Sequence, residues 1–189
     1  QAEEIGDKHG MGNTLHNIGN VHSNKGDYDK ALDYYDRSLK RDEEIGHKYG
    51  MGYSLISIGI VHGNKGDYDT ALDYYKRSLT ICEEIGDKPG MGYILNNIGI
   101  VVHKNKGDCK TAVEFLEKSL TIQKEIGMTQ KELETTTYLY LTYKHLGKDY
   151  DVNEIHSLIK EAENLEFELN YTFYALYELL EDMSYLETA

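Results

Sequence analysis

Small and apolar side chains recur in the first 45 residues with the spacing of two helices rather than of strands. Leu15, Ile18, Gly19 and His22 follow one another at i, i+3, i+4 and i+7, which places them on one face of a helix. After a break at Lys25-Gly26-Asp27, a second stripe of this kind consists of Ala31, Leu32, Tyr35, Ser38 and Leu39. The pattern therefore predicts two helices joined by a tight turn.

The two-helix pattern is repeated along most of the chain. NKGDYDKALDYY begins at Asn24 and NKGDYDTALDYY at Asn64, and the units that start at Ile5 and Ile45 agree at 27 of 40 positions. A third unit starts at Ile85, and a fourth starts at Ile126 and then diverges. Because one helix pair cannot bury its own stripe, neighbouring pairs must stack. We expect an all-α fold, an α-solenoid of stacked antiparallel helix pairs.

Capping residues mark the expected helix ends. Asp7 and Asp87 are placed to cap the first helix of their units, and Pro89 falls in a first helical turn, where its missing N–H is harmless. Gly26 can take a positive φ at the break, and Asp27 can cap the helix that follows.

Each unit also carries a glycine in the middle of its first helix, at Gly19, Gly59 and Gly99. Such a glycine costs about 1 kcal/mol relative to alanine, so its repetition indicates a close approach between helices. The small residues expected across this contact are Ala31, Ala71 and Ala112.

These positions carry a resemblance to a known family. In the second unit they are Ile58-Gly59, His62, Gly66, Ala71, Tyr75 and Ser78. The pattern resembles the tetratricopeptide repeat (TPR), in its subclass with a 40-residue period, over residues 5–125. The resemblance implies a right-handed superhelix and a binding module. In the fourth unit Tyr140 takes the place of the helical glycine, so that helix pair should pack differently.

The repeats divide the chain into one expected TPR domain, residues 1–189. Residues 1–5 resemble the end of a preceding repeat, which suggests a piece of a longer array. Repeats then follow at 6–46, 47–86, 87–127 and, in degenerate form, 128–166. Residues 167–189 read as a capping helix or a partial repeat, and an exposed Phe173, Tyr177 and Leu180 face would favour self-association.

Differences between the repeats mark a candidate binding surface. Between Gly12–Asn24 and Gly52–Asn64 six residues differ, and five of them lie on the side of the helix away from the Leu15 stripe. In TPR proteins this side lines the concave groove, although drifting solvent positions would give the same pattern. The expected peptide-binding residues, called here the variable face, are Asn13, His16, Asn17, Asn20, Asn24, Tyr53, Ile56, Ser57, Ile60, Asn64, Tyr93, Asn96, Asn97, Ile100 and His103.

The chemistry of the variable face favours a peptide ligand. Asparagine amides both donate to and accept from a peptide backbone. Ile56, Ile60, Ile100, Tyr53 and Tyr93 are expected to form an exposed apolar strip for its side chains. The paired Lys and Arg residues with which some TPR domains hold a C-terminal carboxylate are missing from this face.

Composition and charge narrow the function further. A net charge of −13 argues against nucleic-acid binding, and no apolar stretch is long enough for a membrane span. Cys82 and Cys109 read as free thiols of a reducing, cytoplasmic compartment. No phosphate-binding glycine loop, nucleophile motif or metal motif is present, so no catalytic, metal or cofactor site is expected.

Individual side chains carry weaker signals. His22 and His62 read as packing residues rather than as a metal pair, and His103 and His145 as better placed for ligand contact. The remaining candidates are carboxylates that read as a solvated outer face, namely Asp27, Asp29, Asp33, Asp36, Asp42 and Glu43.

The sequence thus predicts a non-enzymatic scaffold that binds a peptide or a partner helix in a concave groove. Two alternatives stay open. The chain could be the regulatory input domain of a larger signalling protein, or a self-assembly module that acts through its C-terminal helix.

Overall fold

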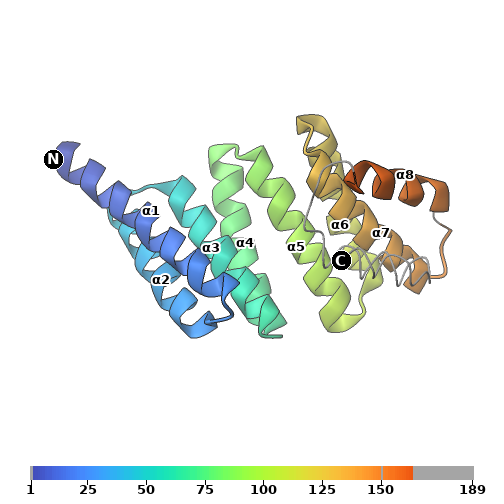
Figure 1. The fold of residues 1–189 in the computed structure, drawn as a ribbon, viewed down its shortest axis with the longest axis horizontal. Helices are drawn as coiled ribbons and strands as arrows, with labels where there is room; N and C mark the ends of the chain where they lie inside the picture. Colours follow the sequence, from blue (N-terminus) through green and yellow to red (C-terminus); the bar gives the residue numbers. More distant parts are fainter. Residues whose placement is uncertain (1, 150, 164–189) are drawn as a thin grey trace. The chain divides into compact units, whose positions relative to one another are not determined.

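The computed structural model describes residues 2–149 and 151–163, and these residues form helices joined by short turns (Figure 1). The helices are α1 (Ala2–Asn24), α2 (Tyr28–Ile45), α3 (Lys48–Asn64), α4 (Tyr68–Ile85), α5 (Lys88–Lys106), α6 (Cys109–Ile126), α7 (Thr129–His145) and α8 (Val152–Glu163). No strand occurs in the described ranges. The expected all-α fold is confirmed.

The chain divides into two compact units, residues 1–97 and residues 98–189. In the first unit α1 packs on α2, α2 on α3 and α3 on α4, and consecutive helices run antiparallel (Figure 1). In the second unit α6 packs on α7 and α7 on α8. Each unit is therefore built by stacking of consecutive helices, as expected of a solenoid.

Glycines in the left-handed conformation end the second helices. Gly46, Gly86 and Gly127 have φ of 68°, 71° and 70°, and the N–H of the following residue bonds to a carbonyl in the last helical turn. This is the geometry that glycine adopts without steric cost. No turn of this kind forms at Gly6-Asp7, because α1 runs without interruption from Ala2 to Asn24.

The expected N-caps form at some positions only. Asp87 Oδ1 accepts from the N–H of Gly90 at 3.1 Å, and Asp108 Oδ1 accepts from the N–H of Thr111 at 3.2 Å. The prediction for Asp7 is wrong, because the residue lies inside α1. Asp27 precedes α2 without a side-chain cap bond.

The carboxylate of Asp27 instead pairs with a histidine of the preceding helix. His22 Nδ1 lies 3.2 Å from Asp27 Oδ2, and His62 Nδ1 lies 3.1 Å from Asp67 Oδ2. In the third repeat Val102 stands at the helix position of this histidine, and Asp108 caps its helix.

The mid-helix glycines mark close contacts, as expected, but the partner differs. A Cβ atom on Gly19 would lie 2.6 Å from Cε1 of Tyr35, and one on Gly59 would lie 2.6 Å from Cε1 of Tyr75. On Gly99 the nearest atom is Cγ of Leu116. The expected alanines are fully buried, but the residue that occupies the space above the glycine is the large one, four positions later.

Serine side chains join the two helices of a pair. Ser38 Oγ donates to the carbonyl of Gly12 at 2.9 Å, and Ser78 Oγ donates to the carbonyl of Gly52 at 2.8 Å. Both serines are buried. The small residue of the repeat therefore serves as a hydrogen-bond donor as well as a packing residue.

In the degenerate fourth repeat Tyr140 stands in the place of the helical glycine. The Tyr140 side chain is half-buried, and its hydroxyl donates to Glu154 Oε2 of α8. Both cysteines are free thiols, as expected. The Phe173, Tyr177 and Leu180 face lies outside the described residues.

The glycine contact gives a first test. Gly59→Leu should lower the free energy of unfolding by about 3 kcal/mol, because the buried Tyr75 ring cannot move aside cheaply. Gly10→Leu is the matched control: a Cβ atom there meets nothing within 4 Å, so leucine should leave stability unchanged or raise it. Urea denaturation followed by circular dichroism measures both. Equal effects of the two substitutions would contradict this packing scheme.

The serine bridge gives a second test. Ser78→Ala removes a buried hydrogen bond between α3 and α4 and should cost about 1 kcal/mol. Thr80→Ala, on the exposed face of α4, removes a bond within the helix and should change stability by less than about 0.5 kcal/mol. Thermal melting of both variants would show whether the bridge between helices stabilises the pair.

Candidate functional site

The residues of the variable face differ in exposure. Asn17 is exposed on α1, and Tyr53 is exposed on α3 with 43% of its surface accessible. Asn13, Asn24 and Asn64 are also exposed, whereas His16, Asn20, Ser57, Ile60, Tyr93 and Asn97 are half-buried. In the second unit Ile100 and His103 are half-buried.

Two expected members of the variable face are not on the surface. Ile56 is 4% exposed and Asn96 is fully buried, so neither lines an open groove. They occupy one repeat position, which is His16 in the first repeat. The His16 ring lies 5.2 Å from the ring of Tyr35, so this position faces the packed helices rather than solvent. The expected apolar strip is consequently interrupted at Ile56.

The amides of the variable face are partly engaged within the protein. The Tyr35 hydroxyl donates to Asn20 Oδ1 at 2.7 Å, and Asn97 Nδ2 donates to the carbonyl of Tyr93 at 3.1 Å. Asn20 therefore holds a core tyrosine in place. Asn17, exposed on α1, is better placed for an external ligand.

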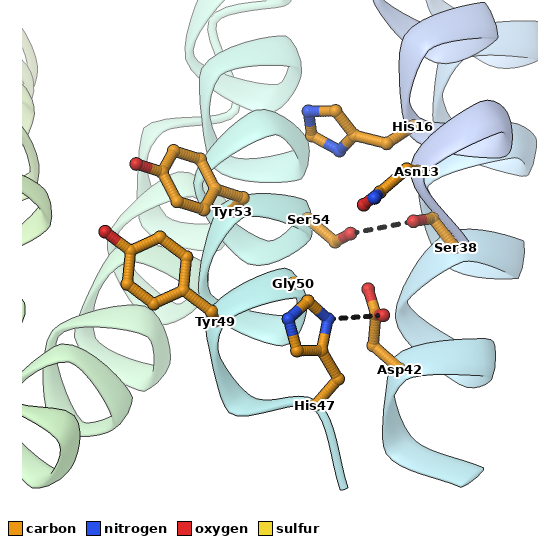
Figure 2. A pocket seen from close by; sticks show the side chains of 9 residues that line it. All are labelled: Asn13, His16, Ser38, Asp42, His47, Tyr49, Gly50, Tyr53 and Ser54. Atoms are coloured by element: carbon orange, nitrogen blue, oxygen red, sulfur yellow. Dashed lines mark hydrogen bonds and ion pairs between the residues drawn. The ribbon is translucent and has the colours of Figure 1, made fainter. Parts of the chain in front are cut away.

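A cavity of about 420 Å³ opens in the first unit where α1, α2 and α3 meet (Figure 2). The first helices contribute Asn13 and His16 from α1 and Tyr49, Gly50, Tyr53 and Ser54 from α3, while Ser38 and Asp42 come from α2 and His47 from the turn. Three residues of the variable face thus line the cavity, together with six that sequence reasoning did not place there.

The floor of the cavity is a buried carboxylate. Asp42 is 1% exposed, and the Nδ1–H of His47 donates to its Oδ1 at 3.0 Å (Figure 2). Gly12 and Gly50 leave the space that this carboxylate occupies, since a Cβ atom on either would meet its oxygens. Asp42 was expected on a solvated outer face, and that expectation is wrong.

His16 forms the α1 wall of the cavity. Its Nδ1 atom is buried and has no hydrogen-bond partner in the described part of the chain. Burial lowers the pKa of this imidazole, against the opposing attraction of Asp42. A neutral ring therefore faces the cavity, and its buried nitrogen is costly to leave unpaired.

Two tyrosines of α3 form the rim. The rings of Tyr49 and Tyr53 lie 5.3 Å apart, and 46% and 43% of these residues remain exposed. Figure 2 shows the two rings side by side, on the opposite side of the cavity from His16. The Tyr49 hydroxyl donates to Asp87 Oδ1 at 3.3 Å.

Comparison of equivalent positions could have exposed part of this site. Asp42 is replaced by Cys82 and Gln123 in the next repeats, and all three are buried. A cysteine at that position is a better indicator of burial than an aspartate. Asp42 lies among other acidic residues in the sequence, and this context led to the prediction that it is exposed.

The remaining histidines form contacts within the fold. His22 and His62 stack on Tyr34 and Tyr74, with ring centroids 5.5 and 5.6 Å apart. In the second unit the rings of His103 and His145 lie 5.0 Å apart. Within the described residues, no group of three or more His, Cys, Asp or Glu side chains could hold a metal ion.

None of the described helices combines the length and the apolar character required to cross a membrane. The search of curated protein sequences finds no match.

Solved structures share the fold at low sequence identity. A putative kinesin light chain of Podosopora anserina with nearly identical TPR-like repeats has a TM-score of 0.64 and 14% identity, and the match covers 93% of this chain and 87% of that one. BtubC of P. vanneervenii has a TM-score of 0.66 and 17% identity, with 81% of this chain and 62% of that one covered.

A third structure is a signal-transduction ATPase (STAND protein) of Pyrococcus horikoshii with a tetratricopeptide repeat sensor. It has a TM-score of 0.71 and 17% identity, and the match covers 94% of this chain. The present chain spans 62% of BtubC and 27% of the ATPase.

The sequence itself assigns the family. A tetratricopeptide repeat family model matches residues 10–83 and again residues 50–125, which together include the repeats whose helix pairs are α1–α2, α3–α4 and α5–α6. The repeated glycine, alanine and serine positions found in the structure fall within these matches. The chain belongs to the tetratricopeptide repeat family.

Proposed function

We propose that this chain is a non-catalytic protein-interaction module that binds a peptide or a partner helix along the first helices of its repeats. Tetratricopeptide repeats are generally protein-interaction modules, which agrees with this proposal. The observation that carries it lies in the first unit. There, exposed Asn13 and Tyr53 line a cavity between α1 and α3 and Asn17 is exposed on α1, while the contacts between paired helices repeat almost unchanged.

The exposed residues suit a polypeptide ligand. Asn17 presents an amide that can donate to and accept from a peptide backbone, and the Tyr53 ring offers apolar surface for a side chain. Farther along α3, Ile60 is half-buried and Asn64, at the end of the helix, is exposed. Binding through such a surface requires no catalytic group, and we propose no enzymatic activity.

A second candidate is a regulatory input domain of a larger signalling protein. The likeness to a STAND ATPase that carries a tetratricopeptide repeat sensor favours it. The coding sequence tests this candidate directly: a nucleotide-binding domain in the same reading frame, on either side of this chain, would support it, and a complete reading frame without one would eliminate it. Self-association through residues 167–189 stays a prediction, to be tested by mass measurement at several concentrations.

The binding proposal is tested with peptides selected against the full chain from a random display library. Asn17→Ala combined with Asn97→Ala should weaken the selected peptides about 30-fold, at about 1 kcal/mol for each lost hydrogen bond. The free energy of unfolding should change little, because Asn17 is exposed and Asn97 donates to the carbonyl of Tyr93 within its own helix.

The matched control is Lys40→Ala, an exposed change on α2 that should leave affinity unchanged. Calorimetric titration gives the affinities. Equal affinities for the parent chain and the double variant, or equal weakening by Lys40→Ala, would reject the variable face as the binding surface.

A further inference from the structure

The polar residues that line the cavity of the first unit are not conserved between this repeat and the next one in the chain. Moving forty positions along the chain replaces Asn13, His16, Asp42 and Ser54 by Tyr53, Ile56, Cys82 and Ile94. Ile56, Cys82 and Ile94 are all buried. Three of these four positions are therefore filled by buried apolar or thiol side chains in the second repeat, where the buried Asp87 stands in place of His47.

Burial of polar side chains at this cavity costs folding free energy, and this cost needs an explanation. A carboxylate at the floor is almost fully withdrawn from water, and its Oδ1 accepts a hydrogen bond from His47. Buried charges are unfavourable unless they are paired and hydrogen-bonded, so the floor favours a ligand that brings positive charge and N–H donors.

The other groups around the cavity match such a ligand. The neutral His16 ring presents an unpartnered Nδ1 atom, which accepts a hydrogen bond when the proton is on the other nitrogen. The exposed rings of Tyr49 and Tyr53 provide aromatic faces at the entrance. Aromatic faces attract cations, and a flat guanidinium stacks on them.

We propose that the cavity between α1 and α3 binds the guanidinium group of an arginine side chain, supplied by the polypeptide partner. The Asp42 carboxylate at the floor pairs with the guanidinium, and the Tyr53 ring stacks on its plane. This inference rests on the proposed function, since it names the chemistry of a partner bound at the same face.

Arginine fits better than lysine for two reasons. Its five N–H donors point in several directions and can bond to more than one acceptor of the cavity at once, whereas an ammonium group has three donors from a single atom. A guanidinium is also more weakly hydrated, so its transfer to a largely dry floor is less costly. The net charge of −13 attracts both cations and does not discriminate between them.

The test uses a capped tripeptide, glycine-arginine-glycine, titrated into the full chain and followed by amide NMR spectra. We expect saturable shifts centred on Asn13, Tyr53 and Ser54, with a dissociation constant on the order of 1 mM. The lysine and citrulline tripeptides should bind at least tenfold more weakly. The lysine peptide carries the same charge and controls for non-specific attraction.

Variants assign the interaction to the cavity. Asp42→Asn keeps the side-chain shape and should weaken arginine binding at least tenfold, while Tyr53→Ala, at an exposed position, should weaken it about threefold. Asn13→Tyr with His16→Ile introduces the residues of the next repeat and should close the cavity and abolish binding. Thr14→Ser is the control, since it also comes from the next repeat but does not line the cavity.

Each outcome decides the inference. Shifts away from the cavity, equal binding of the lysine or citrulline peptide, or no saturation at about 20 mM arginine peptide would overturn it. If Asp42→Asn fails to fold, Tyr53→Ala and the closing double variant still decide. Selected peptides that depend on Asn17 but not on arginine would reject this inference alone. Arginine binding without any selected peptide would reject the peptide-binding proposal and leave the cavity as an arginine site.

Discussion

The structure depends on the contact between a tyrosine ring and a helical glycine. In each of the first two repeats a ring of the second helix lies where a Cβ atom of the first helix would be, and the core around it consists of Ala31, Tyr35, Leu39, Leu55, Ile58 and Val61. The glycine lowers helix propensity by about 1 kcal/mol, and the buried ring more than offsets it. Because this contact fixes the distance between paired helices, the serine bridge from Ser38 to Gly12 and its counterpart in the next repeat form with nearly equal lengths.

A fixed contact leaves other positions free to change without altering the fold. Asp42 and Cys82 occupy the same place, and their partners five residues later are His47 and Asp87. In the first repeat the carboxylate lies at the cavity floor and the histidine donates to it. In the second repeat the carboxylate belongs to Asp87, the later residue of the pair, and it accepts a hydrogen bond from the N–H of Gly90 at the start of α5. Exchange of one pair thus moves a negative charge from a cavity to a helix terminus.

Sequence periodicity predicted the helices, their order and their family, because a repeat shows each packing requirement more than once. Periodicity gave wrong predictions where the position of a side chain depended on one neighbouring side chain. Asp27 was expected to cap α2, but its carboxylate pairs with His22 and forms no side-chain cap bond. Ile56 was expected on the surface because the position varies, yet it varies between buried side chains of different polarity. Variation between repeats therefore marks freedom from the repeated contact, and it does not distinguish solvent from an interior that each repeat fills in its own way.

That distinction explains how nearly identical repeats can differ in binding. Polar residues at an exposed position cost little and carry little information about function. Polar residues at a position that is buried in the next repeat, such as His16 and Asp42, cost desolvation free energy that an apolar pair would avoid. Gly12 and Gly50 leave room for the Asp42 carboxylate, and the equivalent Gly52 and Gly90 border Cys82 in the next repeat, so the same backbone holds either side chain. A ligand that neutralises the charge recovers part of that free energy on binding, and a buried polar position of this kind is for this reason one at which specificity is best sought.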